Sequence, residues 1–106
     1  MENDNQYLYL TTIGRKSGQP REIEIWYIKF NGLFYLIAEK REQANWVRNI
    51  LYNDAVSFRV EGQNFKGTGR VIDPNDESEL WRNVRTLSDR KYGWSEGLVV
   101  ELAPHA

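Results

Sequence analysis

Residues 7–38 read YLYLTTIGRKSGQPREIEIWYIKFNGLFYLIA, and this stretch carries the clearest strand signals of the chain. It contains three runs rich in β-branched and aromatic residues, at residues 7–13, 22–30 and 33–38, and such runs favour strands. Asn31-Gly32 separates the second run from the third, and this dipeptide is preferred in two-residue hairpin turns. The stretch therefore predicts consecutive antiparallel strands.

A cationic turn connects the first two predicted strands. It reads Lys16-Ser17-Gly18-Gln19-Pro20-Arg21. Gly18 permits a left-handed backbone and Ser17 offers a hydroxyl, so such a turn can wrap an anion. Lys16 and Arg21 bring positive charge from its two ends, and Arg15 adds a third charge. The turn alone predicts a phosphate site, with an ordinary solvated hairpin tip as the alternative.

The remaining chain alternates helix and strand patterns. Residues 43–52 predict a short helix, whose apolar face consists of Trp46, Val47, Ile50 and Leu51. Further strands are predicted at residues 55–60, 64–72 and 98–102. Asp73-Pro74 predicts the start of a second helix, because Asp is a common N-cap and Pro suits the first helical position. Its predicted buried side consists of Leu80, Trp81, Val84 and Leu87.

These elements predict a mainly β fold. We expect a six-stranded antiparallel β-barrel with two inserted helices. A chain of 106 residues is large enough for one core and too small for two, so we expect a single domain over residues 1–106.

Composition excludes several classes of function. The formal net charge of −1 argues against nucleic-acid binding, which needs an excess of Lys and Arg. The chain has no cysteine and its one histidine is His105, so neither a zinc site nor thiol catalysis is expected. There is no apolar run of membrane-spanning length, and residues 1–5 are polar rather than signal-like. We therefore expect a cytoplasmic protein without a metal, in which any redox chemistry comes from a bound cofactor.

Three motifs together resemble a known family. Residues 10–21 read LTTIGRKSGQPR, residues 45–50 read NWVRNI, and Asn31-Gly32 and Ala38 lie between them. This order resembles the deazaflavin (coenzyme F-420)-dependent nitroreductase family. That family belongs to the split β-barrel flavin-binding superfamily, which includes pyridoxamine phosphate oxidase. The resemblance implies a homodimeric split barrel that binds a deazaflavin.

The resemblance also implies a set of cofactor-binding residues. Lys16 and Arg21 would hold the acidic tail of the cofactor beside Arg15, while Ser17 and Gly18 shape the turn. The loop after the third strand would contribute Ala38, Glu39, Lys40 and Arg41. Trp26 is expected either beside the ring or at a dimer seam, because aromatic residues suit both settings. Tyr92 and Trp94 are expected on the substrate side, and Tyr27 or water is expected to supply a proton.

The loop at residues 39–45 departs from the family pattern, because it is shorter and more charged than in many relatives. FMN and a tetrapyrrole therefore stand as alternatives to the deazaflavin. The expected function is hydride transfer to a quinone, enone or nitro compound. The alternative is a non-catalytic split-barrel carrier of flavin or tetrapyrrole.

Overall fold

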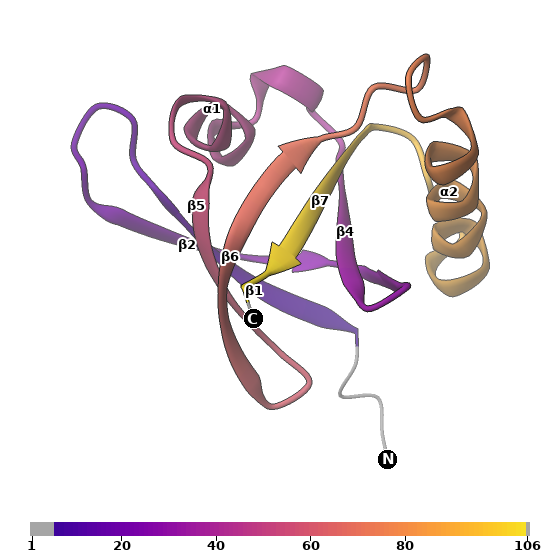
Figure 1. Cartoon of the computed structure of the whole chain (residues 1–106), viewed down its shortest axis with the longest axis horizontal. Helices are drawn as coiled ribbons and strands as arrows, with labels where there is room; N and C mark the ends of the chain where they lie inside the picture. Colours follow the sequence, from indigo (N-terminus) through magenta and orange to yellow (C-terminus); the bar gives the residue numbers. More distant parts are fainter. Residues whose placement is uncertain (1–5, 106) are drawn as a thin grey trace.

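The described residues, 6–105 of a computed structural model, form a curled antiparallel sheet of seven strands with two α-helices (Figure 1). The strands are β1 (Tyr7–Ile13), β2 (Pro20–Trp26), β3 (Ile28–Phe30), β4 (Leu33–Ala38), β5 (Ala55–Val60), β6 (Gln63–Val71) and β7 (Leu98–Pro104). The helices are α1 (Asn45–Tyr52) and α2 (Ser78–Tyr92). The expectation that the chain does not start with a signal peptide concerns residues 1–5. These residues lie outside the described part of the chain. Neither described helix has the length and apolar character needed to cross a membrane.

The order of the strands explains the curl of the sheet. Neighbouring strands follow the order β2-β1-β5-β6-β7-β4-β3, and every pair is antiparallel. The two end strands, β2 and β3, are consecutive in sequence with only Tyr27 between them. The ends of the sheet therefore approach each other at Tyr27. The predicted mainly β, antiparallel barrel with two helices is confirmed as a half-open barrel.

The predicted number of six strands is wrong, because the run at residues 22–30 breaks at Tyr27. The backbone N–H of Tyr27 donates to the hydroxyl of Tyr92 at 3.1 Å, and its carbonyl accepts from Nζ of Lys91 at 3.0 Å. Both partners lie at the end of α2. Side chains therefore replace a neighbouring strand as hydrogen-bond partners at this position. On either side of the break, β2 pairs with β1 and β3 pairs with β4.

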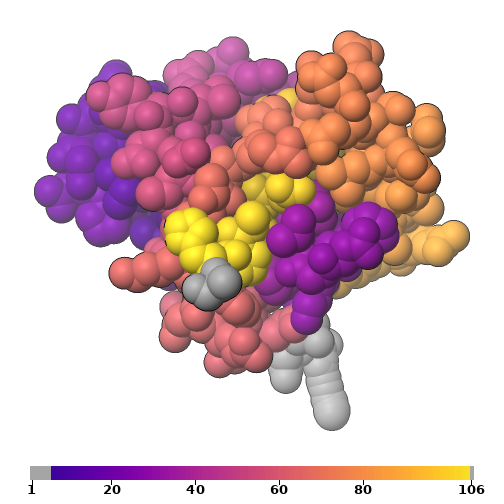
Figure 2. Space-filling view, viewed as in Figure 1, coloured from indigo at the N-terminus to yellow at the C-terminus, as the bar shows by residue number. Residues whose placement is uncertain are grey.

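The sheet packs apolar side chains on both of its faces. Inside the curl, the core includes Leu10, Leu36, Phe58 and, from α1, Val47 and Ile50. On the outer face, a second core includes Tyr35 and Ile37 of β4, Val99 of β7 and Val84 of α2. In the space-filling view, α1 and α2 lie on either side of the yellow β7 segment (Figure 2). The two helices thus cover separate parts of the sheet.

Helix α1 differs from its prediction at the start and on its buried face. It begins at Asn45, after a 3-10 turn at Arg41–Gln43, rather than at residue 43. Leu51, predicted to be buried, is 61% exposed, whereas Asn49 is only 3% exposed. The amide of Asn49 hydrogen-bonds Thr12 and Arg15, so a polar contact turns this position toward β1.

Helix α2 begins at Ser78 rather than at Asp73. The carboxylate of Asp73 accepts the N–H of Asn75 at 2.8 Å, and its carbonyl accepts the N–H of Glu77 at 3.0 Å. These bonds close a separate turn before the helix, so Asp73 caps that turn instead. The predicted buried side of α2 is confirmed: Val84 is buried, and Leu80, Trp81 and Leu87 pack against the same core.

Candidate functional site

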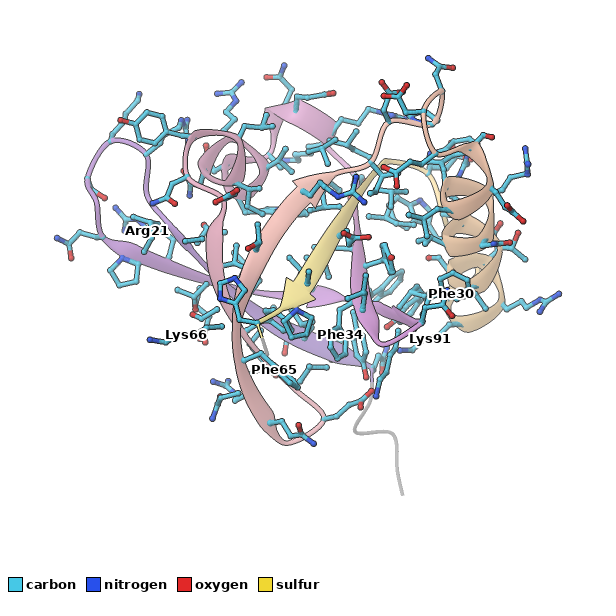
Figure 3. The ribbon with its side chains drawn as sticks, in the orientation of Figure 1. Arg21, Phe30, Phe34, Phe65, Lys66 and Lys91 are labelled. Carbon is cyan, nitrogen blue, oxygen red and sulfur yellow. The ribbon has the colours of Figure 1, made fainter. Side chains whose placement is uncertain are left out.

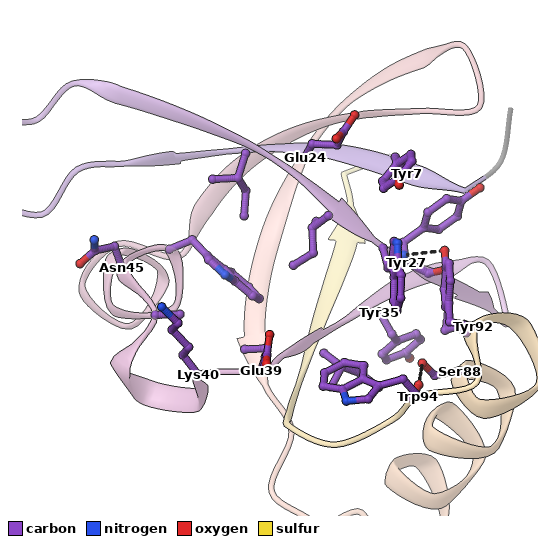
Figure 4. A pocket seen from close by; sticks show the side chains of 18 of the residues that line it. Tyr7, Glu24, Tyr27, Tyr35, Glu39, Lys40, Asn45, Ser88, Tyr92 and Trp94 are labelled. Carbon is purple, nitrogen blue, oxygen red and sulfur yellow. Dashed lines mark hydrogen bonds between the residues drawn. The ribbon is translucent and has the colours of Figure 1, made fainter.

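An open cavity of about 850 Å³ lies between α1 and the end of α2 (Figure 4). Strands β2 and β4 form its walls, and the loop after β4 and the start of α1 close one end. Its lining comprises Tyr7, Ile23, Glu24, Ile25, Trp26, Tyr27, Ile28, Tyr35, Ile37, Ala38, Glu39, Lys40, Gln43, Ala44, Asn45, Trp46, Ser88, Tyr92 and Trp94. An apolar lining with few polar groups is typical of a small-molecule site.

Aromatic side chains form one end of the cavity. The rings of Trp26 and Tyr92 are stacked, with centroids 4.3 Å apart and planes 2° apart. Trp94 meets Trp26 edge to face at 6.4 Å. The hydroxyl of Ser88 donates to the carbonyl of Trp94 at 2.6 Å, which fixes the segment after α2. This end offers a flat, ordered wall to a planar ligand.

The opposite end of the cavity is polar and carries Glu39, Lys40, Gln43 and Asn45. Figure 4 shows Lys40 and Asn45 on the α1 side, away from Tyr92 and Trp94. Ala44, the N-cap of α1, offers no side-chain acceptor to the N–H groups of the first turn. Free N–H groups at a helix start, with a lysine beside them, favour an anionic group.

The cationic turn lies at the far end of the β1–β2 hairpin, where Figure 3 shows Arg21. Backbone bonds between Gly14 and Gln19 (2.8 Å) and between Gly18 and Gly14 (2.8 Å) close the turn. The hydroxyl of Ser17 accepts from the N–H of Gln19 at 3.1 Å and from Arg21 at 3.4 Å. The turn is thus internally ordered by its own side chains.

Arg15 connects this turn to helix α1. Its backbone N–H and its Nη1 both donate to Oδ1 of Asn49, at 3.1 and 3.0 Å. Its Nη2 lies 3.5 Å from Oδ1 of Asn45, which lines the polar end of the cavity. Arg15 is therefore next to the cavity without lining it.

The structure brings about half of the predicted site residues together. The cavity lining includes Trp26, Tyr27, Ala38, Glu39 and Lys40. The predicted residues that do not line it, within the described part of the chain, are Arg15, Lys16, Ser17, Gly18, Arg21 and Arg41. Tyr92 and Trp94, expected on the substrate side, both line the cavity.

Tyr27 is buried, and its hydroxyl has a partner. This hydroxyl donates to Oε2 of Glu61 at 2.8 Å, and Lys91 lies 3.9 Å from the centre of its ring. Burial, followed by the bond to Glu61, raises the pKa of Tyr27 above its ordinary value. Burial lowers the pKa of Lys91, against the opposite effect of Glu61. The phenol of Tyr27 is therefore a poor acid whose proton is already shared with a carboxylate.

Sequence reasoning missed Asn45 and Gln43, the polar neighbours of Lys40. The signal for Asn45 was its place at the start of the NWVRNI motif, directly after the charged loop. It was not found because the predicted helix began at residue 43, which would have placed Asn45 inside the helix rather than at its start. Trp46, predicted on the apolar face of the helix, both packs against the core and lines the cavity.

Comparisons with known proteins agree with this architecture. Residues 2–96 match the family model described as F420H(2)-dependent quinone reductase. An F420H(2)-dependent quinone reductase of Mycobacterium tuberculosis is 27% identical over 90 residues, which cover 80% of this chain and 60% of that protein. The chain thus spans less than two thirds of the length of the curated relatives it matches.

Two solved structures share the fold. One is an F420-H2 dependent reductase, with a TM-score of 0.74, 20% identity, and coverage of 97% of this chain and 98% of that one. The other is the heme storage protein HutZ from Vibrio cholerae, with a TM-score of 0.77, 17% identity, and coverage of 97% and 84%. At these identities the likeness concerns the fold alone.

Proposed function

The chain belongs to the F420H(2)-dependent quinone reductase family, and on that premise we propose that it is a deazaflavin-dependent reductase. Its cofactor is the reduced deazaflavin, and its acceptor is a quinone or another electron-poor compound such as an enone or a nitro compound. The observation that carries this proposal is the cavity, with an ordered aromatic wall at one end and a polar end that carries Lys40 beside the start of α1.

The described residues fit such a cofactor. Ile25, Ala38 and Trp46 add apolar side chains to the lining of the cavity, which suits a planar ring. Lys40 and the uncapped start of α1 suit an anionic tail. Arg15, beside Asn45, extends the positive charge from the cavity toward Lys16 and Arg21 on the turn. Both parts of an amphipathic cofactor thus have partners.

When bound, the reduced deazaflavin supplies the hydride. The chain's own part is to orient the ring and to anchor the tail. We assign the accompanying proton to water entering the open cavity. Tyr27, the side chain expected to compete for this role, already donates to Glu61 and has a raised pKa.

The proposed partner is a second copy of the chain. Tyr7 and Trp26 at the rim of the cavity are 39% and 37% exposed, although both are large aromatic residues. Aromatic residues of this kind are enriched in interfaces between subunits. In a homodimer that covers this rim, Trp26 would lie between the cofactor and the second copy. Trp26 would then be both beside the ring and at the dimer seam, the two positions expected for it.

Binding and turnover assays test the proposal. Reduced deazaflavin is offered with a quinone, an enone and a nitroaromatic compound, and its oxidation is followed by absorbance. Lys40→Ala should weaken cofactor binding by ~1–3 kcal/mol, because it removes a charged side chain that lines the cavity. Lys16→Ala and Arg21→Ala should weaken it as well, because we expect the tail to extend past Arg15 to the turn. Lys66→Ala is the matched control, because Lys66 lies on β6 (Figure 3) and does not line the cavity.

The same assays separate the reductase from a carrier. Tight cofactor binding without oxidation in the presence of any of the three acceptor classes would favour a non-catalytic carrier. Binding of FMN in preference to the deazaflavin would overturn the cofactor assignment.

A further inference from the structure

Asn49 is a buried polar residue between α1 and the cationic turn. Its Oδ1 accepts two hydrogen bonds from Arg15, and its Nδ2 donates to the hydroxyl of Thr12 at 3.0 Å. The backbone N–H and the guanidinium of Arg15 can only donate, so the oxygen of the Asn49 amide, and not its nitrogen, must face them. The amide thus holds the backbone and the guanidinium of Arg15 at the same time.

Among the described residues, the partners of the Arg15 guanidinium are neutral. Its side-chain partners are the neutral amides of Asn49 and Asn45. Within residues 6–105, no carboxylate lies within salt-bridge distance of Arg15. Arg70 is the contrast, because it is paired with the carboxylates of both Glu77 and Glu101.

An aspartate at position 49 would be a closer electrostatic partner for Arg15. It has the same shape as asparagine, it can accept the same two bonds, and the hydroxyl of Thr12 can turn to donate to it. Its negative charge would also offset the positive charge of the guanidinium. The neutral amide orients the arginine while leaving its full charge available to a ligand.

We infer that Asn49 is a positioning residue, which holds Arg15 at the polar end of the cavity, fully charged, for a phosphate or carboxylate group of the ligand. This inference rests on the proposed function, because the anionic group is the tail of the proposed cofactor. A purely structural role would require only the hydrogen bonds, which aspartate preserves.

The test compares the wild type with Asn49→Asp in two titrations. One uses the deazaflavin with its phosphate-bearing tail, and the other uses the same deazaflavin without that tail. Asn49→Asp should weaken binding of the tailed form about 10- to 100-fold, the range for loss of a charged partner, and leave the tailless form unchanged. Asn64→Asp makes the same charge change on β6, and its affinities should equal those of the wild type. Equal affinity of Asn49→Asp and wild type for the tailed form would overturn the inference.

A second measurement needs neither the cofactor nor a stable variant. Inorganic phosphate is titrated into the wild type while the Nε–H resonance of Arg15 and the side-chain amide of Asn49 are followed by NMR. A saturable shift of Arg15 supports the inference, and no shift at Arg15 overturns it, even if Asn49→Asp does not fold. The two proposals can fail separately. If neither deazaflavin binds, the proposed function fails. The inference about Asn49 still stands in that case if phosphate shifts the Arg15 resonance in the wild type but not in Asn49→Asp.

Discussion

The hydroxyl of Tyr92 contacts the backbone at the break between β2 and β3. This hydroxyl accepts the N–H of Tyr27 at 3.1 Å and lies 2.6 Å from the carbonyl of Gln6 and 3.0 Å from that of Tyr27. Tyr92→Phe keeps the ring that stacks on Trp26 but leaves the buried N–H of Tyr27 without its partner. We expect the free energy of unfolding to fall by about 1–3 kcal/mol.

Chemical denaturation measures this loss, and Tyr52→Phe is its control. Tyr52 is 75% exposed, so its hydroxyl is hydrated in both states and its removal should leave stability unchanged. Equal stability of Tyr92→Phe and the wild type would show that the break does not depend on this hydroxyl.

Glu61 should make the stability depend on pH in the acid range. Burial acts to raise the pKa of Glu61, but hydrogen bonds from Tyr27 and Lys29 outweigh burial and hold it below its ordinary value. The folded chain therefore binds fewer protons at this site than the unfolded chain does. The resulting stabilisation is fully present above pH about 4.3, the ordinary value for Glu, and is lost as the pH falls through the lower folded value.

Thermal melts across this acid range test the effect of Glu61→Gln. As the pH falls, the melting temperature of Glu61→Gln should decrease less than that of the wild type, because the variant has no carboxylate to protonate at this position. Glu96→Gln, which removes an exposed carboxylate 3.7 Å from Arg85, should keep the profile of the wild type. Parallel profiles for the wild type and Glu61→Gln would contradict the assigned network.

At the scale of single residues, the sequence marks candidate anion-binding groups but not where they lie relative to the cavity. The cationic turn and the charged loop were both predicted to bind an anion, and of their charged residues Lys40 and Glu39 line the cavity. The distance of Lys16 and Arg21 from the cavity depends on how far the β1–β2 hairpin extends, which local sequence does not encode. The contact of Asn49 with Arg15 joins residues 34 positions apart, so only the folded chain reveals it.

At the scale of elements, the pairing of β6 with β7 depends on Gly67. A Cβ added at Gly67 would lie 2.2 Å from the carbonyl oxygen of Ala103, which belongs to the neighbouring backbone. Gly67→Ala should therefore destabilise the fold by about 3 kcal/mol or more, since backbone cannot yield as a side chain does. At Gly69 the nearest atom is Cδ1 of Ile50 at 3.0 Å, the flexible end of a side chain, so Gly69→Ala should cost less.

Denaturation midpoints of the two variants check this order. A smaller loss of stability for Gly67→Ala than for Gly69→Ala would contradict the close approach of β7 to β6.

The elements were largely predictable because periodicity and turn chemistry are local. Strands 7–13, 33–38 and 55–60 were predicted with their observed bounds. The break at Tyr27 was not, because its cause is the end of α2, which lies 64 and 65 positions away in sequence at Lys91 and Tyr92. The start of α2 was predicted too early because Asp73 suits a turn as well as a helix N-cap.

At the scale of the whole molecule, we expect a homodimer that covers the exposed aromatic rim. Sedimentation should give the mass of two chains, and Trp26→Glu should shift the protein toward one chain, because a charge at the centre of an interface is costly. Leu51→Glu, at an exposed position of α1, should leave the dimer intact. A monomeric wild type would refute the dimer and leave the cavity assignment unaffected.

We expect a deazaflavin in the cavity between α1 and the end of α2, with its anionic tail at the polar end. A crystal structure of the chain with this cofactor bound would show both positions. We expect the ring in the apolar part of the cavity, toward the aromatic wall of Trp26, Tyr92 and Trp94, and the tail beside Lys40 and Arg15. A ring bound elsewhere on the barrel, or a tail directed toward Trp94 and Tyr92, would contradict this expectation.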